Sequence, residues 1–196
     1  PDAPRSVCSV VCSFDGTDLA IEEMGNSLSL DVGRGLLEPT LAALDGTTYM
    51  TIRAEDGHGY VTSSDDGLLW REMQPWCWDD GEPLTMSTTQ QRWIANDHGL
   101  FLVYTRKAVD NVNVMRWRAP LYIAPVDTET LRLTRTGERI VIPLSGDGVN
   151  DADHVARMGN FHTVNASPDE AWVTVGETLP NDDWRGNTLL ARIRWP

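Results

Sequence analysis

Residues 63–70 read Ser-Ser-Asp-Asp-Gly-Leu-Leu-Trp, and this stretch decides how the chain is interpreted. Its spacing, S-x-D-x-G-x-x-W, favours a tight turn between two strands. The side chains of Ser63 and Asp65 can bond the amides of the turn, and Gly67 can adopt a positive φ. Trp70 can pack its ring back against the sheet. The motif therefore predicts a strand–turn–strand unit.

The rest of the chain has the same β-rich character. Helical periodicity is hard to find, and short apolar runs are separated by Asp-Gly pairs at positions 15–16, 45–46, 56–57, 66–67, 80–81 and 147–148. Asp-Gly between apolar runs is a hairpin signal, because glycine accepts a positive φ. Many short strands joined by such turns predict an all-β sandwich, barrel or propeller.

A weak internal repeat favours the propeller. Residues 36–53, 84–106 and 160–177 each contain a strand, a turn with an aspartate, and a second strand that ends in a charged residue. Propeller blades repeat about every 40–50 residues, and insertions lengthen that period. We predict one domain over residues 1–196, with about three four-stranded blades and a piece of another blade at 6–14. Closed rings have about 4–8 blades, so we expect a fragment of a larger ring.

The motif at 63–70 is an Asp-box, and from residue 36 to 195 the chain resembles the sialidase (neuraminidase) superfamily. In that family a glutamate and one arginine of a triad stand just upstream of an Asp-box, as Glu38 and Arg53 do here. The resemblance implies a sialidase-type β-propeller with a six-bladed ring, of which this chain would be a part. It also implies a catalytic role for Glu38, beside the nucleophile, and a grip by Arg53 on a substrate carboxylate.

Two later segments extend the resemblance. Arg118, followed by a degenerate Asp-box at 125–131, looks like another arginine of the triad. Residues 160–177 resemble the segment that carries the family's nucleophilic tyrosine and a glutamate that steadies the remaining arginine, a role that Glu177 fits. Phe161 stands at the tyrosine position and cannot be a nucleophile. We therefore take His162 as the candidate replacement acid or base. For the family's first arginine and its acid/base aspartate we find no match, and Arg5 stands in a different context.

Three further residues are candidates for substrate binding. Tyr104 and Arg106 alternate onto one face of a strand and could line the same mouth as Arg53. Trp78, in the loop PWCWDDGEP, could stack on the apolar face of a sugar. The ordinary alternatives are a packed tyrosine, a solvated arginine and a tryptophan that fills a gap between blades.

Composition limits the partners. The chain has 196 residues and a formal net charge of −13, which makes nucleic acid and anionic membranes poor partners. No apolar run approaches the roughly 18 residues of a membrane span. Its three cysteines are too few for a zinc site or a disulfide framework, and we expect no metal and no cofactor. The expected partner is a glycan or acidic sugar. No signal-peptide pattern follows Pro1, and the resemblance alone implies a secreted or periplasmic protein.

Two functional hypotheses follow. The first is an exo-acting glycoside hydrolase that removes a terminal acidic sugar, with a propeller-type lyase acting on uronates as a related chemistry. In such a lyase His162 or Tyr104 would remove the proton at C5. The second is a non-catalytic propeller that binds a glycan or a protein. The missing tyrosine at position 161 motivates the second hypothesis.

Overall fold

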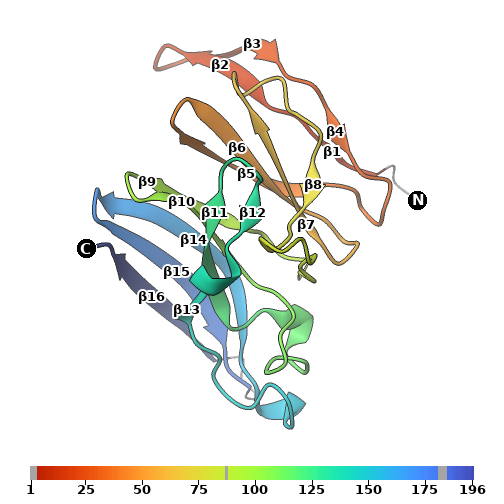
Figure 1. Ribbon diagram of the computed structural model, residues 1–196, viewed down its shortest axis with the longest axis vertical. Coiled ribbons are helices and arrows are strands. Elements are labelled where there is room, and N and C mark those ends of the chain that lie inside the picture. The colour runs from red at the N-terminus through yellow and green to blue at the C-terminus, as the bar shows by residue number, and fades with distance from the viewer. Residues whose placement is uncertain (1–3, 87, 181–184) are drawn as a thin grey trace.

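Antiparallel sheets follow one another through the molecule in the order of the chain (Figure 1). The computed structural model describes residues 4–86, 88–180 and 185–196. Within those ranges the regular structure consists of strands and three short 3-10 turns, at Met115–Trp117, Arg135–Gly137 and Ala152–His154. The all-β prediction is confirmed.

Two small sheets lie at the N-terminal end. One pairs β1 (Ser6–Val7) with β4 (Leu28–Ser29), and the other pairs β2 (Val10–Phe14) with β3 (Leu19–Met24). The predicted blade piece at 6–14 is therefore divided between two sheets. The chain leaves β1 to form the β2–β3 hairpin and returns in β4, which a strand pattern in the sequence does not reveal.

Three larger sheets correspond to the three predicted repeats. Blade A consists of β5 (Leu37–Leu44), β6 (Thr47–Arg53), β7 (Gly59–Ser64) and β8 (Gln74–Pro75). Blade B consists of β9 (Arg92–Asn96), β10 (Gly99–Tyr104), β11 (Leu121–Asp127), β12 (Arg132–Leu133) and β13 (Arg139–Ile142). Blade C consists of β14 (Arg157–Ser167), β15 (Glu170–Thr178) and β16 (Gly186–Arg194). Among the described strands only blade A has the four that the sequence predicted.

The first strands of the three blades lie side by side. Trp93 on β9 donates its Nε1–H to the carbonyl of Thr40 on β5 over 3.0 Å, and Thr163 on β14 donates its hydroxyl to the carbonyl of Trp93 over 2.7 Å. Apolar clusters fill the spaces between the sheets. Leu102 packs between blades A and B, and Val103, its neighbour on β10, packs between blades B and C. Successive residues of one strand thus serve opposite faces of the sheet, as the two-residue strand period requires.

The turn at 64–70 is present, but neighbouring residues stabilise it. Asp66 accepts hydrogen bonds on Oδ1 from the amides of Leu68 and Leu69, both at 2.8 Å, and Ser64 accepts one from the amide of Gly67 at 3.0 Å. The sequence interpretation gave these bonds to Ser63 and Asp65, and it is wrong. Both of those side chains instead accept hydrogen bonds from the guanidinium of Arg71, because the last strand residue, Ser64, turns its hydroxyl into the loop.

The degenerate motif after β11 forms a similar turn. Asp127 accepts hydrogen bonds on Oδ1 from the amides of Glu129 and Thr130, at 2.9 and 3.0 Å. The backbone therefore repeats the aspartate-stabilised turn of blade A without the serine, glycine and tryptophan. Trp70, in contrast, ties blade A to the N-terminal sheets, since its Nε1–H donates to the hydroxyl of Ser9 over 2.8 Å.

Gly35 holds the N-terminal segment against blade A. Its φ is +78°, and a Cβ at this position would lie 2.2 Å from the carbonyl oxygen of Arg5 and 2.5 Å from its amide nitrogen. We expect Gly35→Ala to lower the free energy of unfolding by about 1–2 kcal/mol through the left-handed backbone and by about 1–3 kcal/mol more through the clash. Urea unfolding measures both contributions.

Gly46→Ala is the matched control for Gly35→Ala. Gly46 has a similar φ of +81°, but a Cβ added at this position would meet nothing within 4 Å. Only the backbone contribution should therefore appear in this variant. Equal losses in the two variants would show that the contact with Arg5 carries no strain.

Candidate functional site

Glu38 and Arg53 form an ion pair at one end of blade A. Arg53 donates from Nη1 to Oε2 of Glu38 over 2.9 Å. The register pairs Leu37 with Arg53, so the hairpin itself places Glu38 beside the end of β6. The register shifts between Leu37 and Thr40, and Glu38 has a φ of +45°. A non-glycine residue in this region costs about 1–3 kcal/mol, and such strain concentrates at functional positions.

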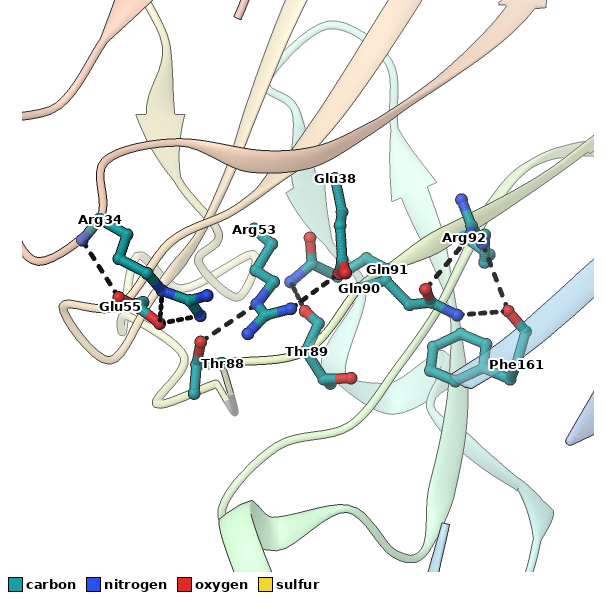
Figure 2. A network of polar contacts seen from close by, with 10 residues as sticks. All are labelled: Arg34, Glu38, Arg53, Glu55, Thr88, Thr89, Gln90, Gln91, Arg92 and Phe161. Carbon is teal, nitrogen blue, oxygen red and sulfur yellow. Dashed lines mark hydrogen bonds and ion pairs between the residues drawn. The ribbon is translucent and has the colours of Figure 1, made fainter. Parts of the chain in front are cut away.

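The Arg53 guanidinium is fixed from a second side. The residue is 7% exposed, and its Nε–H donates to the hydroxyl of Thr88 over 3.1 Å (Figure 2). These two bonds use two of its five N–H groups and set the plane of the fork. Glu38 remains 40% exposed at its side chain, so the pair reaches solvent on the carboxylate side.

A pocket of about 520 Å³ opens beside this pair. Arg5 and Arg34 line it together with Glu38 and Arg53. Arg34 donates from Nε to Oε1 of Glu55 over 2.9 Å, and this bonding lowers the pKa of Glu55 to about 2. The sequence interpretation rejected Arg5 and did not consider Arg34. The contact that brings Arg5 here is a parallel bridge to Gly35, and no local pattern signals it.

Arg118 lies within electrostatic range of the pair. It follows the 3-10 turn at Met115–Trp117 and is half-buried. Burial, followed by the positive charges of Arg116 and Arg53, lowers the pKa of its guanidinium, and the charge of Glu38 acts in the opposite direction. Its Nε–H is buried without a hydrogen-bond partner among the described residues. A buried donor of this kind is rare and marks a place where an acceptor would be favoured.

Glu177 is buried and bonds to uncharged side chains. It is 5% exposed and accepts hydrogen bonds from the hydroxyl of Ser145 over 2.8 Å and from Nδ2 of Asn187 over 3.0 Å. In the part of the chain that the structure describes, no ion pair joins Glu177 to an arginine. The arginine-steadying role that the resemblance implied for Glu177 stays a prediction.

Phe161 and His162 point to opposite faces of β14, as strand alternation predicted. Phe161 is fully buried in the core between blades B and C, whereas His162 is exposed. The carbonyl of Phe161 accepts hydrogen bonds from Nε2 of Gln90 over 2.6 Å and from Nε of Arg92 over 3.3 Å (Figure 2). The segment before β9 thus connects the Arg53 region to β14 through Gln90, which the sequence interpretation missed.

A second carboxylate, that of Glu138, bonds to Tyr104 and Arg106, and Trp78 lies beside Arg106. Glu138 accepts on Oε1 from the hydroxyl of Tyr104 over 2.6 Å and from Nε of Arg106 over 2.8 Å. Tyr104 is fully buried and Trp78 is 5% exposed, so neither ring lines an open mouth, and the alternatives of a packed tyrosine and a gap-filling tryptophan describe them. The guanidinium of Arg106 lies 5.5 Å from the ring centre of Trp78.

Trp78 is buried because the loop after β8 folds back on blade B. The amide of Trp78 donates to the carbonyl of Glu82 over 2.9 Å, and Trp78 forms a parallel bridge with Leu133. These contacts fold the loop against blade B and bury the ring. Strand β10 ends at Tyr104, and Arg106 lies beyond it in an isolated bridge with Met86. Both side chains bond Glu138, which occupies the space in front of them.

The described residues contain no group of three or more His, Cys, Asp and Glu side chains that could hold a metal ion. Over the same residues, no helix is long and apolar enough to cross a membrane.

The sheets follow one another with their first strands adjacent, and this arrangement is that of a β-propeller. A Bombyx mori GH32 beta-fructofuranosidase has this fold in common with the chain, with a TM-score of 0.52 and 15% identity over 92% of this chain and 40% of that one. No family model and no curated protein matches the sequence.

Two further solved structures are similar at a TM-score of 0.47. One is a Trypanosoma rangeli sialidase in complex with sialic acid, with 11% identity over 95% of this chain and 27% of that one. The other is an N-acetylgalactosamine deacetylase from F. plautii in complex with blood group B trisaccharide, with 12% identity over 80% of this chain and 49% of that one. The chain spans less than half the length of each of the three structures.

Proposed function

We propose that this propeller is a sialidase-like, exo-acting glycoside hydrolase that binds a terminal acidic sugar through Arg53 and Arg118. The observation that carries the proposal is the half-buried guanidinium of Arg118, with an unpartnered Nε–H, within electrostatic range of the fixed Arg53–Glu38 pair. A sugar carboxylate is planar and accepts two parallel N–H bonds, which suits the arginine fork.

The local charge supports an anionic ligand. The chain as a whole carries a net charge of −13, yet Arg5, Arg34 and Arg53 line one pocket, and Arg118 acts electrostatically on Arg53. Glu55 compensates Arg34, and Glu38 compensates Arg53. The charges of Arg5 and Arg118 then leave the region positive. A local positive field in an otherwise acidic protein raises the concentration of small anions at that place.

Glu38 is the carboxylate that this proposal places in the chemistry. Glycosidic hydrolysis generally uses two acid–base groups on either side of the bond, and in sialidases a tyrosine replaces one of them. Phe161 has no hydroxyl and is buried, which supports a route without a tyrosine nucleophile. In an inverting route, Glu38 would accept a proton from the attacking water, and His162 stays our prediction for the second group.

The non-catalytic hypothesis has its own supporting observation. The aromatic residue at the expected nucleophile position, Phe161, is fully enclosed in the core between blades B and C. A propeller that keeps the arginines but lacks a nucleophile would bind an acidic sugar and release it unchanged. The lyase alternative loses one of its two candidate bases, because Tyr104 is buried and bonded to Glu138, and burial raises its pKa well above the usual value.

Arg118→Ala tests the proposed carboxylate grip. A hydrogen bond to a charged group contributes about 1.5–3 kcal/mol, so we expect the Kd for free sialic acid to rise about 10–100-fold. Isothermal titration calorimetry measures that affinity. Arg118→Lys should recover only part of it, because an ammonium keeps the charge and loses the fork.

Arg71→Ala is the matched control for Arg118→Ala. Arg71 is half-exposed and pairs with Asp65 on the turn of blade A, so its loss should leave the affinity unchanged. Release of free sialic acid or of an unsaturated uronate from a glycan panel separates hydrolase from lyase. Binding that depends on Arg118 without release of either product would favour the non-catalytic hypothesis. Binding that survives the Arg53→Ala and Arg118→Ala double variant would remove the site from the function.

A further inference from the structure

A hollow larger than the pocket beside Arg53 lies on blade B. It has a volume of about 900 Å³, and its walls come from the segment after β10, from Tyr122 on β11 and from the start of β13. It shares no lining residue with the Arg53 pocket. Blade B has blade A packed on one face and blade C on the other, so both of its stacking faces are occupied within the described chain.

A buried asparagine fixes the segment that forms one wall of the hollow. Asn111 is fully buried, and its Nδ2 donates to the carbonyls of Arg106 and Ala119 over 2.8 and 2.9 Å. The amide of Lys107 donates to the carbonyl of Thr85 over 2.9 Å and ties the same segment to the loop before β9. The wall is therefore formed before any ligand arrives, and a preformed wall loses little freedom on binding.

Apolar side chains on these walls are exposed although the backbone beneath them is fixed. Val109, Val112 and Ile140 line the hollow and are 90%, 45% and 52% exposed. The strand register places Ile140 beside Tyr122, and the guanidinium of Arg106 lies 4.6 Å from the ring centre of Tyr122. Exposed apolar side chains grouped around a hollow mark a binding site for an apolar group.

The charges on the walls favour an anion. Three cationic and two acidic side chains line the hollow, and one pair of them, Arg106 and Glu138, is joined by an ion pair. Lys107 and Arg139 form no ion pair with a described residue. Asp110 is the remaining carboxylate of the lining, so this hollow keeps a net positive charge in a chain whose own net charge is −13.

Tyr122 supplies a hydrogen-bond donor to the same place. Its side chain lines the hollow, and its hydroxyl makes no hydrogen bond with a described residue. Burial, opposed by the charge of Arg106, raises the pKa of Tyr122 to about 12. The hydroxyl therefore stays protonated at neutral pH and can donate to an anion.

A second, mainly apolar hollow of about 470 Å³ continues from the first. The two share Asp110 and Ile140, and the apolar residues that line only the second include Pro120, Pro143 and Leu144. The second hollow has a carboxylate of its own, that of Asp147, and no cationic side chain. The positive charge is thus concentrated at the Lys107 end, and an anionic group is favoured there.

We propose that the blade B hollow binds a small amphipathic anion. Its carboxylate, sulfonate or phosphate lies at Lys107 and Tyr122, and its apolar part lies against Val112 and Ile140. A volume of about 900 Å³ suits a ligand of the size of a drug. The acidic chain disfavours anionic membranes, so the occupant is a free molecule in solution and not a lipid of a bilayer. This inference does not rest on the proposed sugar site.

Two fluorescent probes test the site by titration. Anilinonaphthalene sulfonate is an apolar anion, and phenylnaphthylamine has the same rings without the sulfonate. Lys107→Glu removes an attraction and adds a repulsion, so it should weaken binding of the sulfonate about 5–30-fold and leave the neutral probe unchanged. Ile140→Ser removes apolar contact and should weaken both probes about 3–10-fold. Both positions are exposed, so both variants should fold.

Arg71→Glu and Leu69→Ser are the matched controls. Both residues are exposed at the turn of blade A, and neither variant should change the affinity for either probe. Arg53→Ala should also leave the affinity for the sulfonate unchanged, which separates this hollow from the proposed sugar site.

Three results would overturn the proposal. The first is a sulfonate affinity that is the same in Lys107→Glu and in the wild type, and the second is an equal loss of both probes in that variant. The third is sedimentation of the wild-type chain with phosphatidylserine vesicles, which would assign the surface to a membrane. Circular dichroism of each variant shows whether a lost affinity reflects the hollow or unfolding.

Discussion

Glu138→Ala is expected to lower the free energy of unfolding by about 3–5 kcal/mol, because it leaves a largely buried arginine and a buried tyrosine hydroxyl without their acceptor. The side chains of Arg106 and Glu138 are 21% and 14% exposed, and Tyr104 is fully buried. Burial by itself would lower the pKa of Arg106, but the hydrogen bond and charge of Glu138 outweigh it and raise that pKa. Urea unfolding followed by tryptophan fluorescence measures the loss.

Two variants show whether the loss comes from the buried pair. Glu138→Gln keeps an acceptor and removes the charge, so its effect should be intermediate. Glu82→Ala removes an exposed carboxylate that pairs with Arg135, and exposed ion pairs contribute at most about 1 kcal/mol. If Glu138→Ala were no more destabilising than Glu82→Ala, Glu138 would not hold the cluster together.

Trp76→Ala should have a similarly large effect, of about 3–5 kcal/mol, since it empties the core between blades A and B. Trp76 is fully buried, and its ring contacts Trp93 edge-on with the centroids 5.6 Å apart. Its Nε1–H donates to the hydroxyl of Thr51 over 3.0 Å, so the substitution removes a hydrogen bond as well. Thermal and urea unfolding both report the change.

The conservative variant Trp76→Phe separates the two contributions. It keeps an aromatic ring in the core and removes the N–H donor, and we expect it to cost about 1–3 kcal/mol. Leu69→Ala, at a position that is 68% exposed, serves as the surface control and should stay within about 0.5 kcal/mol of the wild type. A Trp76→Ala loss as small as that of Leu69→Ala would mean that the core collapses around the vacated space.

The fold was largely predictable because its signals are local. The Asp-Gly pair at 45–46 lies between β5 and β6, and the three repeats correspond to the three blades. Pairing between distant segments was not predictable. The short strand β13 joins β11 from outside the repeat, and the N-terminal segment contributes to two sheets. Alternating hydrophobicity identifies a strand, but it does not say which strand will pair with it.

The candidate site was likewise predictable only where its residues lie close together in the sequence. Glu38 and Arg53 lie on the two strands of one hairpin, so their proximity follows from local sequence. Arg5 reaches the same pocket only through its bridge to Gly35. The sequence left the burial of Tyr104 open, because that burial depends on Glu138, which lies 34 positions later and completes a buried charge cluster. The roles of Glu38, His162, Arg53 and Arg118 in binding or catalysis stay predictions.

The link between β5, β9 and β14 has a consequence for how this protein can change over generations. Neighbouring blades are joined by bonds from side chains, such as those of Trp93 and Thr163, to single carbonyl groups. Along these first strands, each sheet therefore keeps its backbone ladder to itself. Residues can be gained or lost in the loops of one sheet without shifting the register of the next, which accounts for the unequal spacing of three otherwise similar repeats.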